Sequence, residues 1–254
     1  MIRGIYTSAA GMATEQVRSE VTTNNLANVN TAGFKKDTAI VKTFPEMLLS
    51  RINDPDKTKV NPTPRPLVGK IGTGSIVDEI VTVHSLGQIK ETGSPLDLAI
   101  SGPGFFVVET PQGERYTRNG VFQLNGEGLL VTAEGYQVQG QIGAIPLQQG
   151  GQVTINESGQ VLLDGQLVDK IRVVDFNPET ELTKEGNSLF RGPAPDIEAD
   201  VRLLQGYQEL SNVNPITEMV NLITVMRTYE MNQKSIQSHD QLLDKAVNEV
   251  GRLG

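Results

Sequence analysis

Cysteine and tryptophan are absent from this 254-residue sequence, aromatic residues make up 5% of it, and histidine occurs twice. Without cysteine the chain can form neither a disulfide framework nor a thiolate metal site, which leaves His84 and His239 as its imidazoles. We therefore expect no metal and no cofactor. Lys and Arg total 22 against 30 Asp and Glu, and the net charge of -8 argues against a nucleic-acid or anionic-membrane binder.

Long apolar runs are missing as well. No segment of the sequence approaches the roughly 18 apolar residues that a membrane-spanning helix requires. The N-terminal residues, MIRGIYTSAAGMATEQ, reach polar side chains before the apolar core of a secretory signal could form. A cleaved signal peptide is therefore not expected, and a chain that leaves the cytoplasm would need another route.

The first thirty or so residues carry apolar side chains at helical spacing. The apolar positions are Ile2, Ile5, Ala9, Met12 and Leu26, and the polar positions between them in the same repeat are Gln16, Ser19 and Thr23. A stripe this narrow cannot form a core alone, so the pattern predicts a helix that needs a partner.

The C-terminal segment predicts a longer helix, from Pro215 to near Gly251. Asn214 supplies an N-cap, and Glu218 lies in the first turn, where the helix dipole favours negative charge. About 36 residues at 1.5 Å each give a helix of roughly 54 Å. Its heptad positions are apolar except at Gln233 and Asp240, and they include Met219, Leu222, Met226, Tyr229, Ile236 and Leu243. Length and heptads together predict a coiled-coil-like partner.

Between the ends, residues from about 75 to 200 alternate apolar and polar side chains in short runs. The expected strands are 75–83, 105–109, 115–124, 129–138, 153–155, 160–163 and 170–176. Turn signals separate them at Gln112-Gly113, Asn125-Gly126, Glu134-Gly135, Ser158-Gly159 and Asp164-Gly165. This pattern predicts an antiparallel meander or a small sandwich. The proline-containing stretch 53–74 predicts an extended connector.

Four ordered motifs carry a resemblance to a known family. Residues 24–34 read NNLANVNTAGF, which physically marks a helix end, with Gly33 able to turn the chain through positive φ. This stretch resembles the N-terminal signature of flagellar rod and hook proteins. Residues 97–107 (DLAISGPGFFV), 116–122 (YTRNGVF) and 206–221 (GYQELSNVNPITEMVN) are also similar to that family, so the resemblance extends over essentially the whole chain.

The resemblance implies an α+β fold in which long N- and C-terminal helices form a coiled-coil inner domain and enclose a central, mainly antiparallel β domain. The expected division is an N-terminal helix 1–35, an extended linker 36–74, the β domain 75–205 and a C-terminal helix 206–254. The expected assembly interface comprises Ile5, Ala9, Met12, Asn24, Asn25, Leu26, Asn28, Met219, Leu222, Met226, Tyr229, Ile236 and Leu243.

The resemblance also implies a function, a location and partners. The chain is expected to be a structural subunit of the flagellar basal-body rod, exported unfolded through the flagellar type III apparatus. Its expected partners are copies of itself, other rod and hook proteins, the export apparatus and envelope ring proteins, with no nucleic acid and no small-molecule substrate. The linker 46–74 favours the distal rod protein, and residues 140–155 look more like the proximal one. Of the two, the distal rod protein is preferred and the proximal one is the alternative.

Enzymatic interpretations are weaker. Asp97, Asp164, Asp169 and Asp175 could supply a carboxylate pair, but aspartates at turns and strand edges usually hydrogen-bond to nearby backbone. The glycine-rich stretch at 102–104 lacks the lysine of a phosphate-binding loop. No catalytic residue is therefore assigned. The alternative from another class is a secreted β-rich binding module on a coiled-coil stalk, which would need one stalk helix instead of two.

Overall fold

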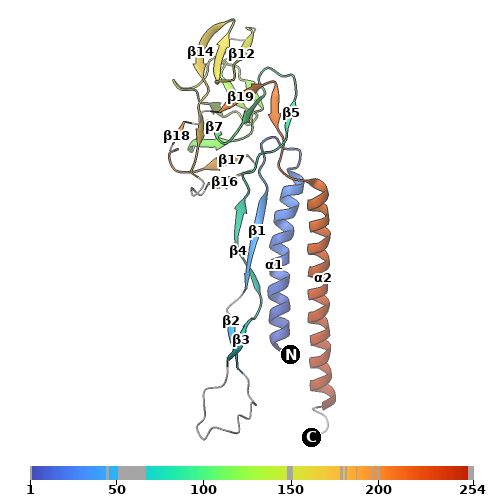
Figure 1. Cartoon of the computed structure of the whole chain (residues 1–254). Helices are drawn as coiled ribbons and strands as arrows, with labels where there is room; N and C mark the ends of the chain where they lie inside the picture. Colours follow the sequence, from blue (N-terminus) through green and yellow to red (C-terminus); the bar gives the residue numbers. More distant parts are fainter. Residues whose placement is uncertain are drawn as a thin grey trace. The chain divides into compact units, whose positions relative to one another are not determined.

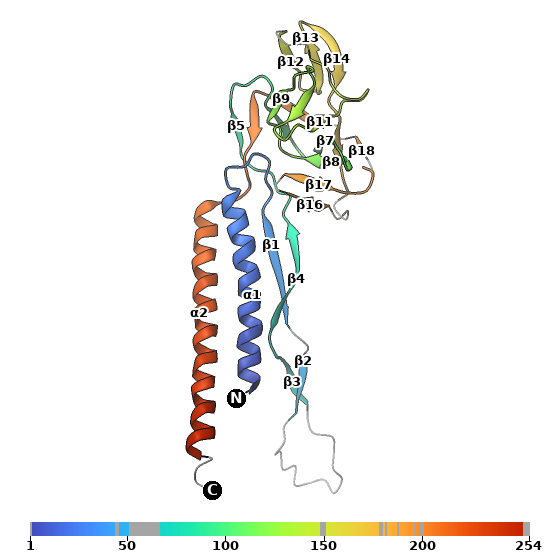
Figure 2. The same cartoon turned by 180° about the vertical axis from the view of Figure 1, so that it is seen from behind.

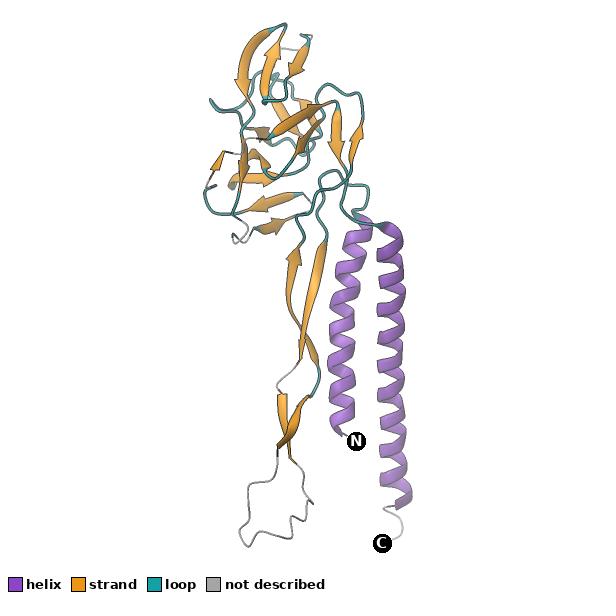
Figure 3. Ribbon diagram, in the orientation of Figure 1, coloured by secondary structure: helices purple, strands orange, loops and turns teal. Residues whose placement is uncertain are grey.

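The computed structural model describes residues 2–43, 46–50, 67–147, 151–177, 180, 182–186, 188–195, 197–198 and 201–250. The chain divides into two compact units, each built from segments that are distant in sequence. Unit 1 comprises residues 1–24, 37–81 and 216–254, and unit 2 comprises residues 25–36 and 82–215. Helices occupy the two ends of the chain and strands lie between them, which confirms the predicted α+β class (Figure 3).

The described residues of unit 1 form two long helices and two short β-ribbons. Helix α1 (Ile2–Ala27) runs antiparallel to α2 (Pro215–Lys245), which continues into the short π-helix η1 (Ala246–Val250) (Figure 1). Strand β1 (Asp37–Thr43) pairs with β4 (Ser75–Thr82), and β2 (Glu46–Ser50) pairs with β3 (Leu67–Gly72). The ribbons lie along α1 on the side away from α2 (Figure 2).

Helix α2 begins at the predicted residue. Pro215 takes the first helical position, and Glu218 lies in the opening turn, as the sequence indicates. The α-helical hydrogen bonding ends at Lys245, and the π-helix covers the next five residues. The predicted end near Gly251 lies outside the described residues. No described helix is long and apolar enough to cross a membrane.

Unit 2 is a mainly antiparallel β structure, as predicted. Its largest sheet follows the order β16-β17-β8-β7-β11-β10-β9, and β15 joins it by pairing with both β7 and β18. Its members are β7 (Phe105–Thr110), β8 (Gly113–Thr117), β9 (Phe122–Leu124), β10 (Leu130–Thr132), β11 (Gln137–Val138), β15 (Val173–Asp175), β16 (Thr183–Glu185), β17 (Leu189–Arg191) and β18 (Ile197–Glu198).

Three smaller sheets also occur among the described residues of unit 2. Strands β12 (Val153–Ile155), β13 (Gln160–Leu163) and β14 (Gln166–Lys170) form a meander, β19 (Arg202–Gln205) pairs with β6 (Leu98–Ser101), and β20 (Tyr207–Glu209) pairs with β5 (Ile89–Glu91). Because β19 and β20 pair with strands from early in the unit, the sheets tie residues 202–209 back to residues 89–101. This closure brings segments distant in sequence to one place.

The apolar core lies in unit 2. Alternating residues of β6 and β7, including Leu98, Ile100, Phe106 and Val108, are completely or almost completely buried in it. A second cluster on the other face of β7 contains Phe105 and Val107, together with aromatic side chains from β8 and β17. Because successive strand residues point to opposite faces, β7 contributes to both clusters.

The turn signals in the sequence are confirmed as connections. The β13–β14 hairpin turns at Asp164 and Gly165, whose φ values of 50° and 82° are both positive, as the mirror-image hairpin turn requires. Two expected strands are each divided. Residues 115–124 split into β8 and β9 around the segment 118–121, where Val121 forms an isolated bridge with Asp97. Residues 129–138 split into β10 and β11 around Gly135, where the chain turns.

The expected linker, 36–74, contains β1, β2 and β3 among its described residues. Its proline-rich part, 51–66, lies outside the described residues. The domain boundaries named from the sequence stay a prediction.

Candidate functional site

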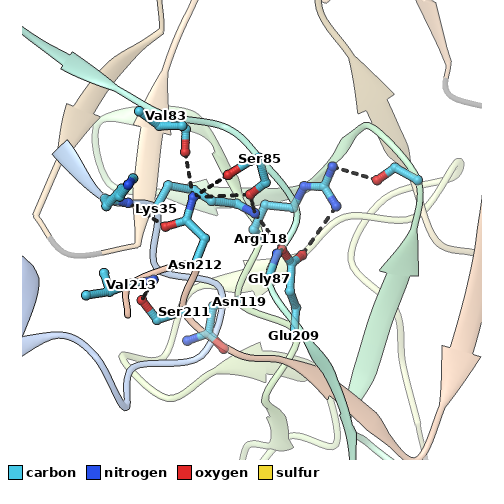
Figure 4. Close-up of polar contacts among 12 residues, drawn as sticks. Lys35, Val83, Ser85, Gly87, Arg118, Asn119, Glu209, Ser211, Asn212 and Val213 are labelled. Atoms are coloured by element: carbon cyan, nitrogen blue, oxygen red, sulfur yellow. Dashed lines mark hydrogen bonds and ion pairs between the residues drawn. The ribbon is translucent and has the colours of Figure 1, made fainter. Parts of the chain in front are cut away.

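A buried ionic cluster in unit 2 joins three charged residues that are far apart in the sequence (Figure 4). The Nζ atom of Lys35 lies 2.5 Å from Oε1 of Glu209, and Nη1 of Arg118 lies 3.4 Å from Oε2 of the same carboxylate. All three side chains are at most 3% exposed. One carboxylate therefore serves two cations in the interior.

Backbone groups also hydrogen-bond to the charged side chains of this cluster. Lys35 also donates to the carbonyl of Ser85 at 2.8 Å, and Arg118 donates through Nη2 to the carbonyl of Gly102 at 2.7 Å. The amide of Gly87 donates to Oε1 of Glu209 at 2.8 Å. Burial lowers the pKa of Lys35 and of Arg118, and the attraction of Glu209 opposes the shift in both. These hydrogen bonds are what keeps such charges tolerable away from water.

Glycines allow the backbone segments around the cluster to approach closely. Gly33 has a φ of 67°, its amide donates to the carbonyl of Glu209 at 2.8 Å, and a Cβ atom there would lie 2.4 Å from backbone atoms of Arg118 and Asn119. A Cβ atom on Gly120 would lie 1.7 Å from the carbonyl oxygen of Leu98. The next residue after Gly33, Phe34, is completely buried.

The cluster thus brings together the four motifs that carry the family resemblance. Gly33 belongs to the first motif, Gly102 to the second, Arg118 to the third and Glu209 to the fourth. Lys35 directly follows the first motif. Sequence reasoning named the motifs but not the charged residues that join them. One signal in the sequence could have indicated these residues: each charged residue of the cluster lies close in sequence to glycine and aromatic residues, which are often buried.

The asparagine-rich motif residues end helix α1. Asn25 and Asn28 are buried, whereas Asn24 is exposed and Leu26 is half-buried. The side-chain oxygen of Asn28 accepts a hydrogen bond from the hydroxyl of Thr31 at 3.2 Å. These contacts shape the chain as it leaves the helix, so the motif works here as a helix terminus. A role of these four residues in an assembly interface stays a prediction.

Small and polar residues make contacts between α1 and α2. The hydroxyls of Ser8 and Ser235 are 3.2 Å apart. A Cβ atom on Gly4 would lie 2.5 Å from the His239 ring, and one on Gly11 would lie 2.8 Å from the Asn232 amide. Glycine therefore permits the close approach of the two helices.

The residues predicted for assembly on α1 and α2 differ in how far they are exposed. On α1, Ile5 and Met12 are half-buried and Ala9 is exposed. On α2, Leu222, Ile236 and Leu243 are half-buried, whereas Met219, Met226 and Tyr229 are 50%, 56% and 36% exposed. A groove of about 440 Å³ runs between the helices and includes Met226 and Tyr229 in its lining. Several predicted residues thus remain available to a partner.

The ribbons of unit 1 also expose apolar side chains. On β2 and β3, Met47, Leu48, Leu49, Val68 and Ile71 are between 44% and 63% exposed. Beside α1 these strands line a second groove, of about 660 Å³. Contiguous apolar surface of this kind usually marks an interaction surface.

The aspartates weighed for catalysis hydrogen-bond to backbone or to neighbouring side chains. Asp97 accepts from the hydroxyl of Thr92 at 2.6 Å, Asp164 accepts from the amide of Gln152 at 2.9 Å, and Asp169 accepts from the amide of its neighbour Lys170 at 2.7 Å. No group of metal-ligating side chains occurs among the residues that the structure describes.

Family models match three consecutive parts of the chain. The model described as "Flagella basal body rod protein" matches residues 5–35, "Flagellar hook protein FlgE/F/G D1 domain" matches residues 99–163, and "Flagellar basal body rod FlgEFG protein C-terminal" matches residues 204–249. The first match contains most of α1 and the first motif, and the third match contains α2 and the fourth motif.

Similar proteins match over nearly the full length. The flagellar basal-body rod protein FlgG of Caulobacter vibrioides is 37% identical, over 95% of this chain and 97% of that protein. FlgG of Bacillus subtilis is 33% identical over 98% and 99%, and the flagellar hook-basal body complex protein FlhO of the same species is 31% identical over 100% of both chains. The four motifs meet in one buried cluster, and long helices lie near the two ends of the chain. This chain belongs to the flagellar basal-body rod protein family and is a structural subunit of the bacterial flagellar basal body.

Proposed function

We propose that this chain is a distal-rod subunit that polymerises into the hollow drive shaft transmitting torque from motor to hook. The observation that carries the proposal is the match to proteins named FlgG over at least 95% of this chain, which includes both terminal helices. In this proposal α1 and α2 form the coiled-coil inner domain, and no residue performs chemistry. Torque passes through packed helices, so the role is mechanical and the chain is not an enzyme.

The assembly interface of the proposal is the set named from the sequence, which includes Met219 and Met226, 50% and 56% exposed. Half-exposed apolar side chains on two paired helices favour burial against neighbouring copies. Each Å² of apolar surface removed from water contributes a free energy of about 25 cal/mol. Other flagellar axial proteins are partners in the same structure. The export apparatus, which would carry the chain without a cleaved signal peptide, and the envelope ring proteins are further proposed partners.

The experiment is deletion and complementation in the source bacterium. Cells without the chain should be non-motile and should lack the distal part of the rod in isolated basal bodies viewed by electron microscopy. Cells that make an epitope-tagged copy should swim, and the tag should be found in purified basal bodies. Complete rods and normal swimming in the deletion strain would contradict the proposal.

The proximal-rod alternative predicts a different defect. A proximal subunit is needed before the distal rod can be added, so its loss should leave basal bodies without either part. The match to FlhO over the full length of both chains supports considering a position in the rod other than that of FlgG. The length of the residual rod in the deletion strain decides between the two positions.

A further inference from the structure

The side-chain amide of Asn212 connects three segments of unit 2 that are distant in sequence (Figure 4). Its Oδ1 atom accepts a hydrogen bond from the amide of Lys36 at 2.8 Å, and its Nδ2 atom donates to the carbonyl of Val83, also at 2.8 Å. Nδ2 also donates to Ser85, whose carbonyl and hydroxyl oxygens lie 3.2 Å and 3.1 Å away. The acceptor and both donors of this amide are therefore satisfied together.

The amide of Asn212 bridges two backbone segments that are joined directly by one hydrogen bond. Lys36 precedes β1 and Val83 follows β4, and the amide of Val83 donates to the carbonyl of Lys36 at 2.9 Å. In an antiparallel hydrogen-bonded pair the two residues also exchange the reciprocal bond. Here the amide of Lys36 and the carbonyl of Val83 bond to Asn212 instead. The side chain thus takes the place of a backbone partner for both.

All three segments lie close in sequence to points where the chain passes between the two units. The chain leaves unit 2 after Lys36, re-enters it at Thr82 and leaves it again after Pro215. Val83 therefore follows the second of these points, and Asn212 precedes the third. One side chain holds the segments through which unit 2 continues into the ribbon and into α2.

We infer that Asn212 is a positioning residue, which fixes these three segments to one another where the chain leaves unit 2. The position requires one acceptor and two donors at the end of a short side chain, which asparagine provides and aspartate does not. Without the bridge, the amide of Lys36 and the carbonyl of Val83 lose their partner, and the segments can separate. For the proposed function, on which this consequence rests, segments held at one spacing can carry a twisting load together.

Amide hydrogen exchange of the purified full-length chain tests the inference at Val83. The amide of Val83 bonds to the carbonyl of Lys36, so truncation of Asn212 leaves its acceptor in place. In Asn212→Ala it should nevertheless exchange about tenfold faster, because the segments separate more often, while the amides of β7 keep their rates. An unchanged rate at Val83 would overturn the inference.

A pair of aspartate variants isolates the two donors of Asn212. Asn212→Asp keeps an acceptor for Lys36 but turns a second oxygen toward carbonyl groups, so exchange at Val83 should again be faster. Asn125→Asp is the matched control, because Oδ1 of Asn125 accepts from the amide of Leu129 at 2.8 Å and a carboxylate can do the same. The amide of Leu129 should stay protected. Protection of Val83 in Asn212→Asp equal to that in the natural chain would show that the donors are not needed.

A disulfide can replace the bridge, because the natural chain has no cysteine. Ser85→Cys/Asn212→Cys places two thiols at side chains that already hydrogen-bond to each other. The reduced protein should exchange as fast at Val83 as Asn212→Ala does, and the oxidised protein should recover the natural rate. Failure of the disulfide to form, or fast exchange after it has formed, would contradict the role of Asn212 in holding the segments together.

Swimming tests the mechanical consequence separately. Cells that make Asn212→Ala should place the tagged chain in basal bodies but should spread more slowly on soft agar than cells with the natural chain. Normal spreading would overturn the mechanical consequence. A natural tagged chain missing from basal bodies would overturn the rod assignment itself, and the exchange rate at Val83 would still decide the role of Asn212 in the fold.

Discussion

The buried cluster of unit 2 depends on Glu209. Its carboxylate accepts hydrogen bonds from two cationic side chains and one backbone amide, and its backbone carbonyl accepts a hydrogen bond from the amide of Gly33. Buried ion pairs contribute little net stability because desolvation offsets attraction, but removal of one partner is costly. The cluster therefore acts mainly by requiring a single arrangement of four distant segments.

Lys35 gives this cluster a predictable pH dependence. Burial lowers its folded-state pKa below 10.5, so between the folded pKa and 10.5 the unfolded chain holds a proton that the folded chain has released. The free energy of unfolding contributed by this group therefore rises with pH across that window. Relative to Lys35→Met, the natural chain should gain stability as the pH approaches 10.5, measured by urea unfolding followed by circular dichroism.

The comparison with Lys35→Met also removes the effect of Tyr116. Burial raises the pKa of Tyr116 above 10.0, so its contribution to stability falls as pH rises above 10.0. Since both proteins contain Tyr116, that slope cancels in their difference. A difference in stability that stays constant or shrinks toward pH 10.5 would show that the Lys35 pKa is not lowered.

Gly33 allows a second prediction. Gly33→Ala combines a positive φ with a Cβ atom only 2.4 Å from the backbone at Arg118 and Asn119, so it should lower the free energy of unfolding by about 2–4 kcal/mol. Gly135→Ala is the matched control, because Gly135 also has a positive φ, 90°, but nothing lies near its added Cβ atom. That control should cost about 1 kcal/mol.

Denaturant unfolding of both variants measures the difference. Equal losses in Gly33→Ala and Gly135→Ala would mean that backbone conformation alone sets the cost, and that the close approach of the first motif to the third contributes nothing.

At the scale of elements, α2 is the most informative helix to interrupt. Met226→Pro places proline in the helix interior, where the missing amide and the ring clash cost about 3 kcal/mol or more. Since Met226 belongs to unit 1, the β sheets of unit 2 should remain folded while assembly is lost. The measurements are swimming, the presence of the chain in basal bodies, and the amide NMR spectrum of unit 2, which should keep the signals of the folded sheets.

Met226→Leu is the control for this variant. It keeps the helix and most of the apolar volume, so it should assemble. Normal motility of Met226→Pro would show that an uninterrupted α2 is not required in the rod.

The sequence predicted those elements whose signals are local. Asp164 and Gly165 specify their hairpin by residue type alone, and Pro215 marks the start of α2. The ionic cluster was not predicted, because residues 35, 118 and 209 are far apart in the sequence and meet only in the folded unit. Helical spacing identified apolar stripes, but it did not identify the close approach of Gly4 and Gly11 to side chains of α2, which depends on the lack of a side chain at both positions.

At the scale of the whole molecule, the two units differ in what they bury. Among the described residues of α1 and α2, one buried side chain is apolar, Val225. The other buried side chains of these helices are polar: Ser8, Thr14, Glu15, Thr22, Asn25 and Glu218. Unit 2 buries two clusters rich in phenylalanine, leucine and valine. Because apolar burial provides most of the stability of packed helices, the paired helices should open far more readily than the sheets.

Amide hydrogen exchange on the purified full-length monomer measures this difference. Residues 2–24 and 216–245 should exchange rapidly, while β6 and β7 stay protected with close to the global free energy of unfolding. In purified rods the same helices should become protected, because neighbouring copies then cover the exposed methionines of α2. If the helices of a confirmed monomer were protected as strongly as β7, their contact would already be sufficient within one chain, and the exposed apolar face of α2 would need an explanation other than assembly.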